Sequence, residues 1–108
     1  MHKLTVAQLQ KYLELKYKDT GITESLFMKL VEEIGEVAEV LNQIQGLKKK
    51  TTDNSLANEL ADVIHYTFAI AALNGIDLEQ AIIEKDKAGS LKYNQTPNLF
   101  EFVQNNEE

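Results

Sequence analysis

The stretch ESLFMKLVEEIGEVAEVLNQIQ, from Glu24 to Gln45, decides the fold of this 108-residue chain. Its apolar residues are separated alternately by three and four positions: Phe27, Leu30, Ile34, Val37, Leu41 and Ile44. This spacing predicts an amphipathic helix over residues 24–45 that packs lengthwise on another helix. Gly46 follows directly, and glycine is typical of the position just past a helix end.

A second helix is predicted before this stretch, over residues 5–18, because apolar residues recur there at helical spacing. Thr5 with Gln8 has the pattern of a capping box, in which each side chain binds the backbone N–H of the other residue. The Asp-Thr-Gly sequence at 19–21 then breaks the helical pattern.

Two further helices are predicted after a polar connector over residues 48–54. One covers residues 55–74, and the other covers residues 77–88. Asp77 with Gln80 resembles a second capping box. Gly89-Ser90 is expected to end the last helix.

These elements predict an all-α protein with a four-helix core, an antiparallel helical bundle without a β-sheet. We expect one domain over residues 1–108, with a core over 4–94 and a C-terminal tail over 95–108. From Leu91 onward the chain is too apolar for a simple solvated end, so it is expected to pack on the body or on a neighbouring subunit. A domain this small buries a modest share of its surface, so self-association is also expected.

The composition argues against several classes of protein. The chain has no cysteine, which excludes disulfides and thiolate sites. Its formal net charge of -6 argues against nucleic-acid binding, and its basic run, Lys48-Lys49-Lys50, is expected to be a solvated connector. No segment reaches the roughly 18 consecutive apolar residues of a membrane span, and the start of the chain does not resemble a signal peptide. The expected location is the cytoplasm.

Two carboxylates of the 24–45 helix fall at or near its apolar side. At about 100° per residue, Glu33 lies inside the apolar arc and Glu36 lies just beyond its edge. Glu32 and Glu39 lie on the outer face, where glutamates are common on the helices of soluble proteins. A single Glu-x-x-Glu pattern is therefore weak evidence for a site.

The predicted 55–74 helix carries a second acidic pair in an apolar setting. Eleven of the fourteen residues from Leu60 to Leu73 are apolar and surround the helix axis, which is typical of a buried helix. Glu59 and Asp62 nevertheless project beside them. A buried, isolated carboxylate loses its hydration, so it must be protonated, paired with a cation or bound to metal.

The acidic pairs converge if their two helices form an antiparallel hairpin. Each pair has i, i+3 spacing, which places both carboxylates on one helix face. Close carboxylates repel by roughly 4 kcal/mol per pair at intermediate dielectric, and Lys29 is the only lysine on the inner faces. A divalent cation relieves this repulsion, and Mg²⁺ or Mn²⁺ suits an all-oxygen set of ligands. The sequence therefore predicts a divalent-metal site.

The same residues resemble a known family. Glu32-Glu33-Ile34-Gly35-Glu36, followed by Glu59-Leu60-Ala61-Asp62, is similar to the paired signature of the MazG-like nucleoside triphosphate pyrophosphohydrolases. That signature is Glu-Glu-x-x-Glu on one helix and Glu-x-x-Asp on the next, and the resemblance spans about residues 4–94. It implies a four-helix fold assembled as a dimer or tetramer. It also implies magnesium-dependent hydrolysis of a nucleoside triphosphate to the monophosphate and pyrophosphate.

The resemblance also implies roles for individual acids. The metal ligands it implies are Glu33, Glu36, Glu59 and Asp62. Glu32 is then a further acid that either reaches a second metal or orients the attacking water. The expected catalytic set is Glu32, Glu33 and Glu36. Because the triphosphate is strongly negative, only intervening cations make such an acidic pocket attractive to it.

Members of the family end the fourth helix with lysine, asparagine and a Lys/Arg-Tyr-Pro segment that meets the phosphates. Gly89 stands here in place of the asparagine and Asn94 in place of the proline. The phosphate contacts expected from this resemblance and from the inner helix faces are Lys29, Lys85, Lys92 and Tyr93. For Lys85 and Lys92, a helix-end cluster that favours the helix dipole is an equal alternative.

Two other functions remain open at this point. A non-catalytic helical oligomerisation or interaction module would use the apolar tail and the long seam equally well. Phosphoribosyl-ATP pyrophosphohydrolase belongs to the same superfamily and shares the acidic motif. His65 is expected to pack or form a hydrogen bond rather than bind metal.

Overall fold

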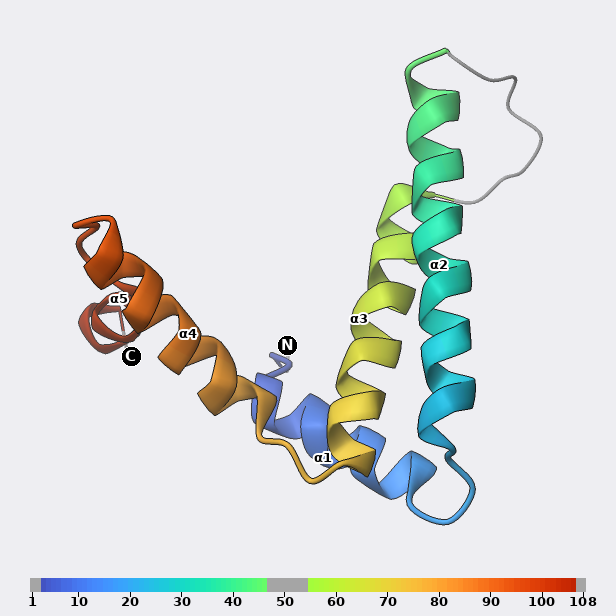
Figure 1. The fold of residues 1–108 in the computed structure, drawn as a ribbon, viewed down its shortest axis with the longest axis horizontal. Helices are drawn as coiled ribbons and strands as arrows, with labels where there is room; N and C mark the ends of the chain where they lie inside the picture. The colour runs from blue at the N-terminus through green and yellow to red at the C-terminus, as the bar shows by residue number, and fades with distance from the viewer. Residues whose placement is uncertain (1–2, 47–54, 107–108) are drawn as a thin grey trace. The chain divides into compact units, whose positions relative to one another are not determined.

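Five α-helices make up the described part of the computed structural model (Figure 1). The structure describes residues 3–46 and 55–106, so the Lys48-Lys49-Lys50 connector lies outside the described residues. The helices are α1 (Val6–Tyr17), α2 (Thr23–Ile44), α3 (Leu56–Leu73), α4 (Leu78–Lys92) and α5 (Leu99–Asn105). No strand occurs within those ranges, which confirms the all-α prediction. None of the described helices is long and apolar enough to cross a bilayer.

The chain forms two compact units, Met1–Gly75 and Ile76–Glu108. In the first unit, α2 and α3 lie side by side as an antiparallel pair, and α1 packs on α3 (Figure 1). In the second unit, α5 packs on α4. The buried apolar residues of the described chain all belong to the first unit: Leu13, Leu26, Val40, Phe68, Ala69 and Ala71. The first unit therefore holds the hydrophobic core.

The helix caps agree with the sequence pattern at α1 and partly at α4. Thr5 accepts a hydrogen bond from the N–H of Gln8 at 3.1 Å, and Gln8 accepts one from the N–H of Thr5 at 2.9 Å. The predicted capping box is thus confirmed at α1. Asp77 accepts the N–H of Gln80 at 3.1 Å, but the Gln80 amide donates to Glu84 at 2.7 Å. At α4, half of the predicted box is formed.

The inward face of α2 is rotated from the predicted seam. Leu26 and Val40 are buried, and Leu30 and Val37 are half-buried, so the contact with α3 lies on this side. Glu33 is half-buried on the same side. The other members of the predicted seam are exposed: Phe27, Ile34, Leu41 and Ile44. The apolar arc of α2 is wide enough for two contacts, and α3 fills one of them.

The fourth helix does not end at Gly89-Ser90, as predicted, but continues to Lys92. A glycine inside a helix costs about 1 kcal/mol relative to alanine, and this does not by itself break the helix. The Ser90 hydroxyl is turned inward and donates to Asp86, one turn earlier, at 3.4 Å. The chain leaves the helix beyond Tyr93, where Asn94 has a positive φ of 53°.

The apolar tail contains a helix that the sequence pattern did not reveal. α5 begins with a complete capping box between Asn98 and Glu101. The Asp86 carboxylate on α4 accepts the N–H of Leu99 at 2.7 Å, which ties the start of α5 to α4. The Asn-x-x-Glu pattern was the available signal for this helix.

Gly21, in the link between α1 and α2, has no room for a side chain. A Cβ at this position would lie 2.8 Å from a methyl carbon of Leu73 and 2.8 Å from both Cβ and the carbonyl oxygen of Tyr17. At the predicted helix break over residues 19–21, the chain therefore passes close to the end of α1 and to the end of α3.

Candidate metal centre

Three carboxylates from two helices meet in the first unit. Glu33 lies on α2, and Glu59 and Asp62 lie in the first two turns of α3. Each offers one oxygen, and these oxygens all lie within 4.8 Å of one another. We call these three residues the carboxylate cluster. The antiparallel pairing of α2 and α3 brings them together, as the sequence predicts for these three residues.

Burial differs among the members of the carboxylate cluster and changes their chemistry. Glu59 is 5% exposed, Glu33 is half-buried and Asp62 is exposed. Burial, then a hydrogen bond to Glu59, then the charges of Asp62 and Glu59 raise the pKa of Glu33 from 4.5 to about 7. Burial and nearby negative charge both disfavour the ionised form of an acid. A bound cation would reverse the second effect.

The exposure of Asp62 differs from the expectation that apolar residues surround α3. Leu60 and Ile64, which flank Asp62, are about half exposed at 47% and 49%. The beginning of α3 is thus covered on one side only. The buried apolar residues of α3 lie near its C-terminal end: Phe68, Ala69 and Ala71. Burial therefore constrains Glu59 more strongly than Asp62.

The other predicted acids of α2 lie outside the carboxylate cluster. Glu36 is exposed, one turn after Glu33. Glu32 is also exposed, and its carboxylate lies 3.3 Å from the ammonium of Lys29. The hydrogen bond and charge of Glu32 raise the pKa of Lys29. The structure thus brings together three of the four predicted ligands and pairs Lys29 with Glu32.

The predicted phosphate contacts of the fourth helix belong to the second unit. Lys85, Lys92 and Tyr93 are all exposed, and the Lys92 ammonium lies 5.4 Å from the centre of the Tyr93 ring. Gly89 shares a side of α4 with Lys85 and Lys92, because these positions are four and three residues from it. A Cβ at Gly89 would meet nothing within 4 Å, so this side of the helix has room for a larger side chain.

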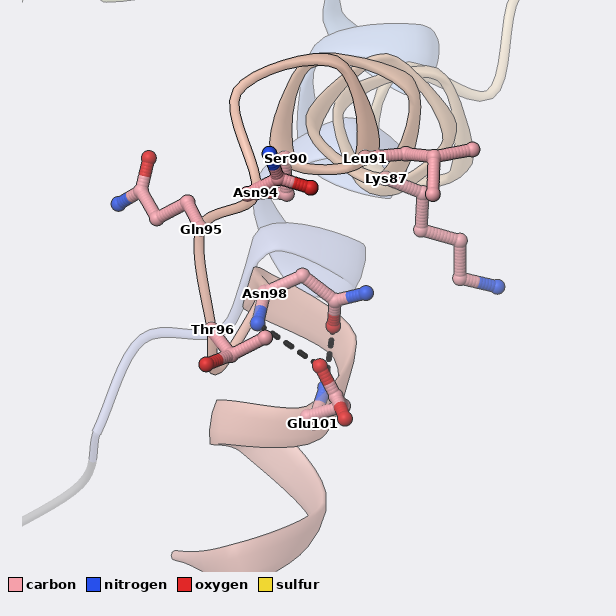
Figure 2. A pocket seen from close by; sticks show the side chains of 8 residues that line it. All are labelled: Lys87, Ser90, Leu91, Asn94, Gln95, Thr96, Asn98 and Glu101. Carbon is pink, nitrogen blue, oxygen red and sulfur yellow. Dashed lines mark hydrogen bonds between the residues drawn. The ribbon is translucent and has the colours of Figure 1, made fainter.

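A pocket of about 460 Å³ lies within the second unit (Figure 2). Its lining side chains are mostly polar: Lys87, Ser90, Leu91, Asn94, Gln95, Thr96, Asn98 and Glu101. Asn98 and Glu101 are bonded to each other in the α5 capping box, as the dashed lines show. By helical periodicity, Lys87 and Leu91 lie on the opposite side of α4 from Lys85 and Lys92. This pocket is thus not the predicted phosphate site.

A polar contact joins α1 to α3 one turn beyond Asp62. The Tyr17 hydroxyl lies 2.7 Å from Nε2 of His65. This contact confirms the hydrogen-bonding role predicted for His65. Tyr17 is one of the apolar residues that recur at helical spacing over residues 5–18, and no signal in the sequence pairs it with His65.

Comparison with known proteins identifies the family. The family model described as the MazG nucleotide pyrophosphohydrolase domain matches residues 22–88, which include the carboxylate cluster. The crystal structure of iMazG from Vibrio DAT 722 is similar, with a TM-score of 0.64 and 31% sequence identity. That match covers 85% of this chain and 100% of the other. A search of curated proteins returned no match. The chain belongs to the MazG family.

Proposed function

We propose that this protein hydrolyses nucleoside or deoxynucleoside triphosphates to the monophosphate and pyrophosphate, with Mg²⁺ or Mn²⁺ as cofactor. The observation that carries the proposal is the carboxylate cluster on two helices of a MazG-family fold. Family membership supports the class of reaction, and the cluster supports the dependence on a divalent metal.

The donors of the carboxylate cluster fit such a metal. All three are carboxylates, and hard divalent cations prefer oxygen ligands. Within residues 3–46 and 55–106, no ion pair compensates the charge of the cluster. Burial raises the pKa of Glu33 most, and the hydrogen bond to Glu59 and the uncompensated charge of the cluster raise it further. We propose Glu36 as a fourth ligand, since it follows Glu33 by one turn.

In this proposal each acidic residue of the site has its own role. When bound, the metal activates water and offsets the charge of the leaving pyrophosphate. Glu33 and Glu59 would hold the metal from the buried part of the site, and the exposed Asp62 and Glu36 would hold it from the side open to the substrate. Glu32 orients the attacking water. Hydrolysis adds one water across the α–β phosphoanhydride bond, and the two products share its atoms.

The phosphate contacts remain part of the proposal. Lys29 meets a phosphate at the same time as it shares its charge with Glu32, 3.3 Å away. Lys85, Lys92 and Tyr93, on the fourth helix and at its end, are the further phosphate contacts that the family pattern predicts. Lysine side chains pair well with phosphate oxygens, which the triphosphate requires wherever metal does not reach it.

We further propose that the protein acts as a homo-oligomer, a dimer or tetramer, in the cytoplasm. α2 exposes an apolar stripe made of Phe27, Val31, Ile34 and Leu41. A second copy of the same stripe would cover it in a two-fold symmetric contact. The whole chain acts as one domain in this proposal, because the described part of the second unit contains no buried apolar residue.

A substrate panel tests the proposed function. The purified protein is incubated with Mg²⁺ and each ribo- and deoxynucleoside triphosphate, with phosphoribosyl-ATP included, and the products are separated by ion-exchange chromatography. We expect equal amounts of monophosphate and pyrophosphate from at least one nucleoside triphosphate, and none from the Asp62→Asn variant. Release of single phosphates contradicts the proposal.

A second candidate function, the non-catalytic interaction module, is favoured by the exposed stripe of α2. Absence of turnover with every substrate, in a protein that is folded and oligomeric, would support it. Turnover confined to phosphoribosyl-ATP would instead assign the chain to that branch of the superfamily.

A further inference from the structure

Three aromatic rings form a continuous corner where α1 meets α3. The Tyr17 and His65 rings meet edge to face, with centroids 5.7 Å apart and an interplanar angle of 80°. The His65 and Tyr66 rings also meet edge to face, at 4.9 Å and 73°. All three side chains are half-buried, so each keeps part of its surface open. We call Tyr17, His65 and Tyr66 the aromatic corner.

The aromatic corner borders the carboxylate cluster. His65 and Tyr66 follow Asp62 by three and four residues, which places them on the same side of α3 about one turn further along. The separation of one turn is roughly 5.4 Å along the helix axis. The charge of Asp62 favours the protonated form of His65. An electrostatic interaction with Tyr66 is one of the causes of the raised pKa of Lys29 on α2. A molecule bound at the cluster by one end would therefore reach the corner with the other.

His65 offers one ring nitrogen to a ligand. Its Nε2 is engaged with the Tyr17 hydroxyl. Its Nδ1 has no hydrogen-bond partner among the described residues, where no buried polar side-chain atom lacks a partner, so Nδ1 is open to solvent. Burial, followed by the charge of Lys16, lowers the pKa of His65, which favours the neutral ring. In the tautomer where Tyr17 donates to Nε2, Nδ1 carries the hydrogen and donates.

This arrangement has the chemistry that recognises a flat heterocycle with a polar edge. Aromatic faces stack on any base, whereas a fixed hydrogen-bonding group distinguishes one base from another. Sites that hydrogen-bond a substrate group discriminate strongly against analogues that lack it. If the contact between Tyr17 and His65 served only to hold α1 against α3, it would require neither the open Nδ1 of His65 nor a position one helical turn from Asp62.

We propose that the aromatic corner binds the base of the nucleotide whose triphosphate is held at the carboxylate cluster, and that His65 selects the base through Nδ1. This inference rests on the proposed function and specifies its substrate contacts. Tyr17 acts as a positioning residue, because its hydroxyl fixes the orientation of the imidazole.

The test compares kcat/KM across the bases for the wild type and three variants. His65→Phe keeps a ring and removes the hydrogen bond, and Tyr17→Phe removes only the hydroxyl. We expect both to reduce discrimination in kcat/KM between the best and worst base by about tenfold. His65→Gln, which restores a polar group, should recover part of the discrimination. Equal loss of kcat/KM on every base would overturn the inference and leave the pair a structural contact.

Tyr12→Phe is the matched control. Tyr12 is exposed on α1, and its ring, like that of Tyr17, lies 5.9 Å from the Lys16 ammonium. Removing its hydroxyl should leave base preference unchanged. Thermal unfolding of each variant, followed by circular dichroism, establishes that it is folded.

A failure of the proposed function gives a different result. If the wild type turns over no substrate, calorimetric binding of the nucleoside triphosphates with Mg²⁺ takes the place of kcat/KM. Base-dependent affinity that His65→Phe abolishes would then support the aromatic corner without catalysis. Affinity that is independent of the base in the wild type would overturn it.

Discussion

Glu33 on α2 and Glu59 on α3 meet across the helix pair, with carboxylate oxygens within 4.8 Å of each other. After burial, the hydrogen bond to Glu59 is the largest cause of the raised pKa of Glu33. Two acids in one partly buried contact oppose folding unless a proton or a cation lies with them. In this protein, therefore, stability and metal binding should be coupled.

Metal should stabilise the folded protein through the carboxylate cluster. A ligand bound only to the folded form at about a hundred times its Kd raises the free energy of unfolding by about 2.7 kcal/mol. Calorimetric melting with Mg²⁺ should show this gain for the wild type and little or none for Glu59→Gln. Glu14→Gln, an exposed acid on α1, should keep the full gain. Equal gains in all three proteins would show that Mg²⁺ binds elsewhere.

The stability of the metal-free protein should fall as pH rises from about 4.5 to about 7. In this interval the folded chain keeps a proton on Glu33 that the unfolded chain has lost, so folding is favoured at the lower pH. Melting in the presence of a chelator measures the effect. In Glu33→Gln this contribution should disappear, so the difference between the two proteins should change with pH. A constant difference would mean that Glu33 titrates normally.

Gly21→Ala should destabilise the protein by about 1–3 kcal/mol, the usual range for overpacking. The added methyl group would lie 2.8 Å from Leu73 and from two atoms of Tyr17, one of them a backbone oxygen. Gly89→Ala is the control, because nothing lies within 4 Å of its Cβ. That variant should gain about 0.5–1 kcal/mol, as expected inside a helix. Urea unfolding compares the two, and a neutral Gly21→Ala would argue against the tight link.

The exposed stripe of α2 should form the contact between subunits. Phe27→Asp places a charge on this stripe and should shift the protein toward monomers in analytical ultracentrifugation. Leu15→Asp changes an apolar residue of α1 that is 60% exposed, compared with 54% for Phe27, and should leave the assembly intact. A monomeric wild type, or equal effects of both variants, would place the contact elsewhere.

The sequence predicted the helices well where local signals act. The Thr5–Gln8 capping box and Gly46 lie at helix ends as predicted, since caps depend on residues within one turn. The prediction that Gly89-Ser90 ends the fourth helix was wrong because it also used local residues alone. Glycine ends a helix only on average, and here the Ser90 hydroxyl donates a hydrogen bond to Asp86 on the same helix.

The site was predicted less completely than the helices. Glu33 and Glu59 stood out because acids on apolar faces need an explanation, and the structure places them together. The exposure of Asp62 and the rotation of α2 depend on which side of each helix meets which neighbour. Periodicity predicts the apolar face of each helix but not which faces pack together. It therefore did not predict the contact between Tyr17 and His65.

A time course of the reaction by ³¹P nuclear magnetic resonance tests the central claim most directly. The best substrate from the panel is incubated with wild type or Glu59→Gln, each with Mg²⁺ or with a chelator. The monophosphate and pyrophosphate signals should grow together only for the wild type with Mg²⁺. Orthophosphate as the first product, turnover in the chelator, or a Glu59→Gln variant as fast as the wild type would contradict the claim.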